Sequence, residues 1–208
     1  MVRFLVLALL GSPFLGCPAA FGADAIGQIY DQQVGSIERE VLALVEAMPA
    51  DKFDFAPGDF SPGKGTFAGV RTFALQARHD ATMIWRISAS VLGEQPPLDT
   101  GPGDNGPATL KTKDQIVEYF KGAVAYAHKA MSSMTQQNML DRVPSPLGPG
   151  MTTRLAAAAF LGLHSYDHYG QMVVYARMNG VVPPASAPRG PAPGAGKGAA
   201  VKGPQGGR

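Results

Sequence analysis

Two histidines, His164 and His168, lie four residues apart in the segment LGLHSYDHYGQMVVYARMNG. The segment has helical periodicity, and residues four apart on a helix project from one face with Cβ atoms roughly 5–6 Å apart. Two imidazoles at this spacing can bind one divalent metal ion. A third histidine would complete a site with an open position for water or substrate, as in catalytic zinc centres. The pair therefore predicts a metal centre, provided that another helix supplies the third ligand.

The sequence contains four histidines in all, so the third ligand would be His79 or His128. His128 lies about 100° from the apolar stripe of its segment and is followed by Lys129, a pattern typical of a surface position. His79 lies opposite the main apolar stripe of its own segment, but between Leu75 and Met83 on a second apolar face. Periodicity alone gives His79 only a modest lead. With no third ligand, the two histidines would hydrogen-bond to neighbouring helices or belong to a row that faces solvent.

Four segments with helical periodicity must position these side chains. Each is about 26 residues long, which corresponds to a length near 39 Å. No stretch alternates convincingly like a β-strand, so the sequence predicts an all-α four-helix bundle. The third helix begins at the capping box Thr112-Lys113-Asp114-Gln115, and Gly180 ends the fourth. The predicted helices cover residues 26–48, 67–92, 112–134 and 153–179.

The connections between the helices, residues 50–65, 94–110 and 138–152, are rich in Gly and Pro. All three are longer than the usual tight turn of a helical bundle. Long connections permit a crossover between helices that are not adjacent, so loop length does not fix the winding order.

The composition fits one globular domain, predicted at residues 23–182, with 45% hydrophobic and 16% charged residues. Residues 183–208 are rich in Pro, Gly and Ala and are predicted to be a disordered basic tail. Of the 18 Lys and Arg, one is Arg3 and four lie in this tail, which leaves 13 basic against 16 acidic residues, a net charge of −3. The domain therefore lacks the basic stripe that nucleic-acid binding requires.

The first 22 residues, MVRFLVLALLGSPFLGCPAAFG, have the pattern of a secretory signal peptide. Arg3 precedes an apolar run, and small residues lead up to a cleavage site after Gly22. The run is interrupted by Pro13 and too short for a stable membrane span. We expect an exported protein, periplasmic or extracellular. An uncleaved N-terminal anchor and a lipid anchor at Cys17 are the alternatives, and cleavage after Gly22 would leave no cysteine nucleophile or disulfide.

The chain resembles the DinB/YfiT superfamily of metal-binding four-helix proteins. The resemblance rests on a histidine in the second helix (ARHDATMIWRI), a third helix with AYAHKA, and the H-x3-H followed by Gly-Gln in HSYDHYGQ. The segment VEAMPADKFDFAPG also resembles that family's first connection, and the similarity covers roughly residues 25–185. It implies that His79, His164 and His168 bind a divalent metal, often zinc or nickel, and that His128 has no matching role. It also implies an up-down-down-up winding.

The resemblance implies a chemistry for the site but no single reaction. Three neutral imidazoles leave the charge of the ion uncompensated, so it would acidify a bound water or polarise a thiol. Some relatives are thiol transferases or isomerases, and others are described only as hydrolases. We therefore expect a metal-dependent thiol S-transferase or hydrolase, attacking a small-molecule substrate with a metal-bound water or thiolate. A non-catalytic metal-binding or stress-response protein, and a scaffold whose histidines never meet, are the alternatives.

Several further residues are candidates for supporting roles. Asp167 is a carboxylate that could orient a metal-bound histidine of another helix, and Gln171 could hydrogen-bond a metal-bound water or a loop. Tyr169, or its neighbour Tyr166, could line the metal pocket. Arg86 could bind an anionic substrate. A second copy of the chain is a further possible partner, through an exposed helix face.

Overall fold

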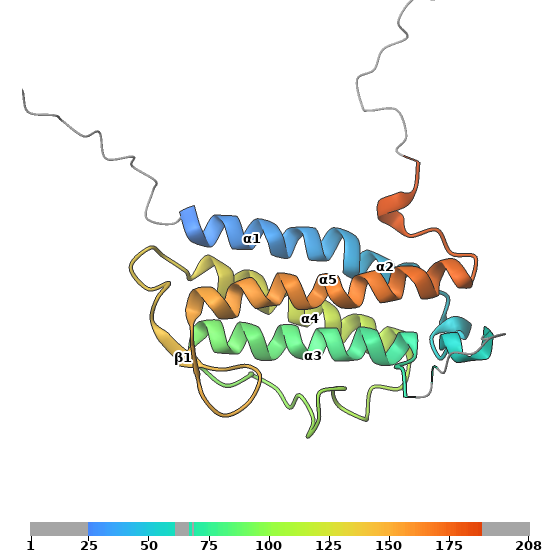
Figure 1. Ribbon diagram of the computed structural model, residues 1–208, viewed down its shortest axis with the longest axis horizontal. Helices are drawn as coiled ribbons and strands as arrows, with labels where there is room; N and C mark the ends of the chain where they lie inside the picture. Colours follow the sequence, from blue (N-terminus) through green and yellow to red (C-terminus); the bar gives the residue numbers. More distant parts are fainter. Residues whose placement is uncertain (1–24, 61–66, 68, 189–208) are drawn as a thin grey trace, which may run out of the picture.

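The computed structural model describes residues 25–60, 67 and 69–188, and four long helical segments lie side by side in it (Figure 1). The predicted all-α bundle is therefore confirmed. The first segment is continuous but contains one π-helical turn, η1, which the periodicity did not predict. The helices are α1 (Ala25–Ile37), η1 (Glu38–Leu42), α2 (Ala43–Ala47), α3 (Phe73–Leu92), α4 (Lys113–Ser132) and α5 (Arg154–Met178).

Helices α3 and α4 run in the same direction. Near their beginnings, Nη1 of Arg78 donates to the carbonyl of Leu110 at 3.0 Å. Further along both helices, the rings of Trp85 and Tyr126 have centroids 5.0 Å apart. Contacts thus advance along both helices together. A parallel pair needs a long connection, and residues 93–112 provide it by returning along the length of the bundle (Figure 1).

Helix α5 runs in the opposite direction to α3. Gln76 of α3 donates to Gln171 at 2.7 Å, whereas Asp80, one turn later in α3, accepts from the earlier residue Ser165 at 2.9 Å. Figure 1 shows α1 running in the direction of α5, against α3 and α4. The winding is therefore up, down, down, up, which matches the winding implied by the family resemblance.

Threonine caps and glycine stops set the ends of the helices. The side chains of Thr72, Thr112 and Thr153 each accept a hydrogen bond from a backbone N–H in the first turn of the helix that follows. At Thr112 the predicted capping box is confirmed, with both reciprocal hydrogen bonds present. Gly93 and Gly180 have φ of 75° and 74° and follow the ends of α3 and α5.

The second helix begins later than the sequence indicated. Periodicity placed its start near Phe67, but α3 begins at Phe73, after the Thr72 cap. Gly69 has a φ of 83°, which breaks the helical backbone. Val70 was assigned to the apolar stripe, but it lies outside the helix with 41% of its surface exposed. Because Val70 has the spacing of the apolar stripe, the predicted helix began too early, before the Thr72 cap.

Two short β-strands are present, although none was predicted. β1 (Arg142–Pro144) pairs antiparallel with β2 (Met151–Thr153), and Val143 lies opposite Thr152. Three residues are too few for an alternating pattern to be recognised in a sequence. The hairpin is fixed to α3 because Oγ of Ser90 donates to the carbonyl of Pro144 at 2.5 Å.

The core lies between the four helices, and α3 is buried on nearly all sides, as its two apolar faces predicted. Short 3-10 turns lie at the end of the bundle where α3 begins: η2 (Ala50–Lys52) and η3 (Pro57–Phe60), with η4 (Pro184–Ser186) against α2. The largest fully buried side chains are those of Val34, Ile37, Leu44, Met48, Phe73, Ile84, Ile87, Phe120, Met131, Met134, Leu161 and Met172.

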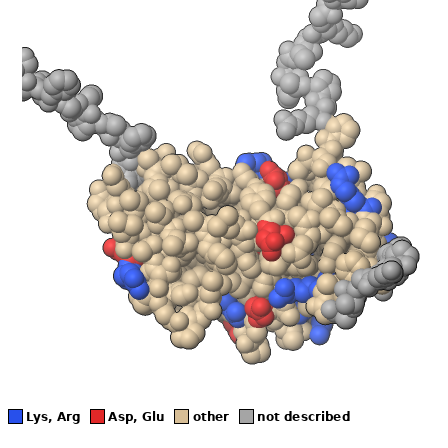
Figure 2. All heavy atoms as spheres, in the orientation of Figure 1, with Lys and Arg blue, Asp and Glu red and all other residues tan. Residues whose placement is uncertain are grey.

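The two predicted terminal segments fall largely outside the described residues. The predicted signal peptide and Cys17 lie entirely outside them, and of the predicted tail only residues 183–188 are described. Within the described part, none of the helices is both long and apolar enough to cross a membrane. Figure 2 shows a face on which charged side chains occur in small separate groups of both signs.

Candidate metal centre

The structure brings His79 of α3 together with His164 and His168 of α5. The ring centroid of His79 lies 5.0 Å from that of His164 and 4.5 Å from that of His168. The centroids of the two α5 rings are 4.5 Å apart. One ring nitrogen from each histidine lies within 4.8 Å of the other two. Zinc–imidazole bonds are about 2.0–2.1 Å long, so three nitrogens this close together would have to move only a short way toward one another to bind one ion.

Hydrogen bonds fix the tautomers of two of the three rings. Nδ1 of His79 lies 2.6 Å from the carbonyl oxygen of Asp104, and Nδ1 of His168 lies 2.8 Å from Oε1 of Gln76. Both oxygens only accept hydrogen bonds, so each Nδ1 carries the proton and donates it. Nε2 of each ring is then left as an unprotonated atom with a lone pair, the form in which histidine binds a metal.

His164 supplies the observation that tests whether a metal fits. Its Nε2 is buried and has no hydrogen-bond partner within the described part of the chain. Buried polar atoms are almost always partnered, so an orphaned nitrogen requires an explanation. A divalent ion between the three rings would satisfy it directly. The donor set, three imidazole nitrogens, suits zinc and nickel among other first-row ions.

The electrostatics of the site keep the three rings neutral near pH 7. Burial, together with smaller effects of the neighbouring His168 and His79, lowers the pKa of His164 to about 4. Burial, followed by His79, likewise lowers the pKa of His168 to about 4. Burial also lowers the pKa of His79, although its hydrogen bond to the Asp104 carbonyl acts in the opposite direction. Neutral imidazoles bind metals without first releasing a proton.

A chain of amide side chains orients His168. Gln76 accepts from His168 and donates through Nε2 to Oε1 of Gln171 at 2.7 Å; Nε2 of Gln171 in turn donates to Oδ2 of Asp167 at 3.3 Å. Gln171 thus contacts another glutamine, and the hydrogen-bond partner of Asp167 is Gln171 rather than a histidine. No pattern in the sequence pointed to Gln76. The feature that could have revealed it is its position three residues before His79, which places Gln76 and His79 on one face of α3.

A buried carboxyl group lies next to the metal centre. Asp80 follows His79 in the chain, and its Oδ1 accepts a hydrogen bond from Ser165 while Oδ2 has no partner among the described residues. Burial raises the pKa of Asp80 to about 7, against the opposing effect of the Ser165 hydrogen bond. The burial of Asp80 could not be predicted from the sequence, because it depends on how α3 packs against α5.

Three other candidates have contacts of their own. Tyr166 and Tyr169 pack against each other with ring centroids 5.9 Å apart, and a lining role for either stays a prediction. His128 connects α4 to α1, because its Nδ1 lies 2.6 Å from Oδ1 of Asp31. His128 is therefore not part of the cluster.

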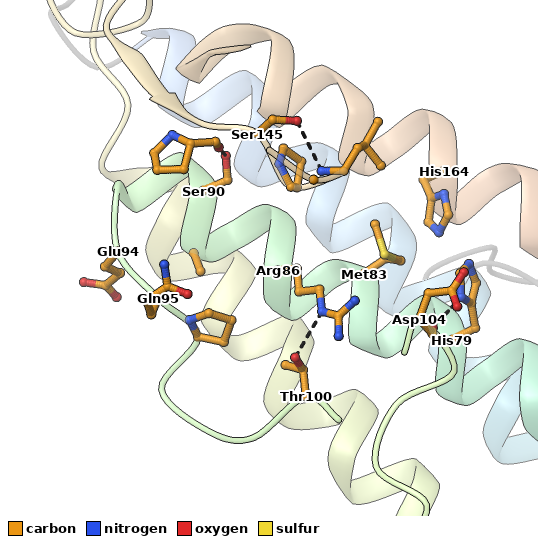
Figure 3. A pocket seen from close by; sticks show the side chains of 16 residues that line it. His79, Met83, Arg86, Ser90, Glu94, Gln95, Thr100, Asp104, Ser145 and His164 are labelled. Atoms are coloured by element: carbon orange, nitrogen blue, oxygen red, sulfur yellow. Dashed lines mark hydrogen bonds between the residues drawn. The ribbon is translucent and has the colours of Figure 1, made fainter. Parts of the chain in front are cut away.

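A cavity of about 630 Å³ adjoins the cluster and includes His79 and His164 in its lining. Its floor is one row of α3 that contains His79, Met83, Arg86 and Ser90. Residues 94–104 and 144–148 contribute the walls, so two of the long connections predicted from the sequence enclose it (Figure 3). The volume is within the usual range for small-molecule sites, about 300–1,000 Å³. A small molecule in the cavity would lie beside the histidines.

Comparison with known proteins gives the family. The model of the DinB superfamily, a metal-binding family, matches residues 35–172. The match covers more than half of the chain and contains all three clustered histidines. A search of the curated proteins gave no match. The family match, together with the helical bundle and the histidine cluster, shows that this chain belongs to the DinB superfamily.

Proposed function

We propose that the protein is an exported metalloenzyme that transfers a thiol to a small electrophilic molecule or hydrolyses such a molecule. The observation that carries the proposal is the position of His79 and His164, which belong both to the histidine cluster and to the lining of the cavity. A substrate in the cavity would therefore reach the open side of a metal held by His79, His164 and His168. A purely structural metal site would be closed by a fourth protein ligand.

The side chains around the site have distinct roles in this proposal. A bound zinc or nickel ion supplies Lewis acidity and favours the deprotonated form of a thiol or of water. The Asp104 carbonyl and Gln76 hold the rings of His79 and His168 in the metal-binding tautomer. Met83 gives the cavity an apolar surface next to His79, which keeps bulk water away from a bound substrate.

The thiol would be a second substrate. The only cysteine of the chain is Cys17, in the predicted signal peptide, and the described domain contains none. Neither reaction can then proceed through a cysteine of the domain. Transfer requires a low-molecular-weight thiol that enters the cavity, whereas hydrolysis requires only water.

Export is proposed from the first 22 residues, in which Arg3 is followed by an apolar run and then by small residues up to Gly22. The test is to express the full chain in a bacterium, fractionate the cells and determine the N-terminus of the product. A mature chain that begins at Ala23 in the periplasm or medium supports export. An intact N-terminus on cytoplasmic protein contradicts it.

The reaction is tested with a screen of thiol-transfer and hydrolysis substrates on metal-loaded protein. His168→Ala is the inactive variant, and His128→Ala is the matched control because His128 lies outside the cluster. Turnover that is lost only in His168→Ala supports the enzyme. Bound metal without histidine-dependent turnover would favour the alternative, a non-catalytic metal-binding or stress-response protein.

A further inference from the structure

We propose that the guanidinium of Arg86 binds an anionic group of the substrate, so that the cavity selects small molecules with a carboxylate some distance from the reacting atom. The inference rests on the proposed function, in that the cavity is taken as the substrate site. It extends that proposal from a small electrophile of any kind to an anionic one.

Arg86 lies in the floor of the cavity at a defined distance from the histidines. It follows His79 by seven residues in α3, two helical turns, so the two positions are separated by about 10 Å along the helix axis. Figure 3 shows its guanidinium in the middle of the cavity, between the histidines and Ser90. Met83, 4% exposed, lies between His79 and Arg86 in the same row. The floor therefore offers a metal site, an apolar surface and a cation, in that order.

The guanidinium is held in place by neutral groups. Its Nε donates to Oγ1 of Thr100 at 3.0 Å, and its Nη2 donates to the carbonyls of Gly101 and Gly103 at 3.0 and 2.9 Å. Nη1 takes part in none of these hydrogen bonds. The plane of the guanidinium is thus fixed, while one nitrogen with two N–H groups keeps its donor capacity for a ligand.

No described carboxylate forms an ion pair with Arg86. Within the described residues, none of the ion pairs with an N···O distance of 4.0 Å or less involves Arg86. The carboxylates in the cavity lining already have partners. Oε1 of Glu94 lies 3.7 Å from Nζ of Lys129, and Oδ2 of Asp104 lies 3.4 Å from Nη2 of Arg71. The unbalanced charge in the cavity is therefore positive and belongs to Arg86.

A carboxylate is the ligand that fits this arrangement. The planar, weakly hydrated guanidinium of arginine pairs well with carboxylates, and such charge-assisted hydrogen bonds are stronger than neutral ones. The apolar surface of Met83 would contact the chain between the carboxylate and the reacting end. The inferred substrate is accordingly a small molecule with an electrophilic end, a short apolar spacer and a carboxylate.

The test measures the binding of two eight-carbon probes, suberate with two carboxylates and octanoate with one, to the Zn²⁺-loaded full chain. One carboxylate of either probe can occupy the open side of the metal, and only suberate has a second for Arg86. We expect suberate to bind wild type about tenfold more tightly than octanoate. Arg86→Met should abolish this preference, and Arg86→Lys, which keeps the charge, should retain part of it. Zn²⁺ affinity should stay the same in both variants, and octanoate binding by the loaded protein should change much less than suberate binding, because the metal holds its single carboxylate.

Two results would overturn the inference. One is an unchanged preference for suberate in Arg86→Met. The other is a parallel loss of Zn²⁺ affinity and octanoate binding in that variant, which would mean that Arg86 only holds the 100–104 loop in place. A separate experiment measures octanoate binding to the metal-free protein. Metal-free wild type should bind octanoate at least fivefold more tightly than metal-free Arg86→Met does. This experiment requires neither metal nor turnover, so a failure of the proposed function remains distinguishable from a failure of the anion site.

Discussion

Oε1 of Gln76 lies 2.8 Å from Nδ1 of His168, so a residue of α3 fixes the ring of a histidine in α5. Because Gln76 precedes His79 by three residues, one face of α3 supplies both a metal ligand and the group that orients another. Gln171 holds the amide of Gln76 in turn. The α3–α5 contact therefore determines the tautomer of His168, and it would be lost if the two helices slid past each other by one turn.

Replacement of Gln76 should weaken metal binding without removing a ligand. In Gln76→Leu the ring of His168 loses its acceptor, and mutation of such an orienting group typically lowers metal affinity 10–100-fold. A competition titration of Zn²⁺ against a chromogenic chelator measures the change. Gln32→Leu, at an exposed position of α1, is the matched control and should leave the affinity unchanged. Equal affinities for wild type and Gln76→Leu would show that the hydrogen bond does not support the site.

Asp80 should make the stability of the metal-free protein depend on pH. Burial raises its pKa from the usual 3.8 to about 7 in the fold. The folded protein then binds this proton more tightly than the unfolded chain, so the contribution of Asp80 to stability is complete below about pH 4 and is lost as the pH rises through 7. Asp80→Asn cannot ionise. It should be more stable than wild type by about 2–4 kcal/mol at pH 8.

Urea denaturation of the metal-free proteins between pH 4 and pH 8 tests this difference. The histidines titrate in both proteins, so their effects cancel when Asp80→Asn is compared with wild type. The stability difference should be small at pH 4 and grow steadily toward pH 8. Asp54→Asn, at an exposed carboxylate, should show no such trend. A difference that stays constant with pH would contradict a buried, protonated Asp80.

The helices and two of the metal ligands could be predicted from local signals in the sequence. Apolar spacing located four helices, and the threonine and glycine residues at their ends, such as Thr112 and Gly180, act through neighbouring backbone alone. His164 and His168 form a pair because helical geometry relates residues four apart. The third ligand was different: periodicity gave His79 only a modest lead over His128, and the family resemblance supported His79.

What could not be predicted depends on contacts between distant segments. Gln76 and Asp80 acquire their roles from the register of α3 against α5, which no spacing within either helix reveals. The cavity walls are connections, and their sequences show length and composition but not position. The start of α3 was predicted too early because Val70 continued the apolar stripe. In the structure Gly69 has a non-helical backbone, and the helix begins only after the Thr72 cap.

Two glycines should respond in opposite ways to the same substitution. A Cβ atom at Gly27 would lie 2.7 Å from the carbonyl oxygen of Met134 and 3.0 Å from that of Met131, so α1 and the end of α4 approach each other too closely for a side chain. Gly27→Ala should destabilise the protein by about 1–3 kcal/mol. At Gly170, in α5, a Cβ atom would meet nothing within 4 Å. Gly170→Ala should stabilise the protein by roughly 0.5–1 kcal/mol through helix propensity.

Urea denaturation midpoints of both alanine variants measure this pair. The backbone carbonyls near Gly27 cannot move without shifting α4, whereas Gly170 faces open space. If Gly27→Ala were as stable as wild type, the close approach of α1 to α4 would be disproved. Destabilisation by Gly170→Ala would indicate that something packs on that exposed part of α5.

The metal content of the purified chain tests the central claim most directly. After loading with Zn²⁺ or Ni²⁺ and removal of free ions, elemental analysis should find about one ion per chain in wild type and in His128→Ala. His164→Ala and His168→Ala should hold almost none, because each removes one of three ligands. Wild type that retains no ion, or a His164→Ala variant that retains as much as wild type, would contradict a metal centre at His79, His164 and His168.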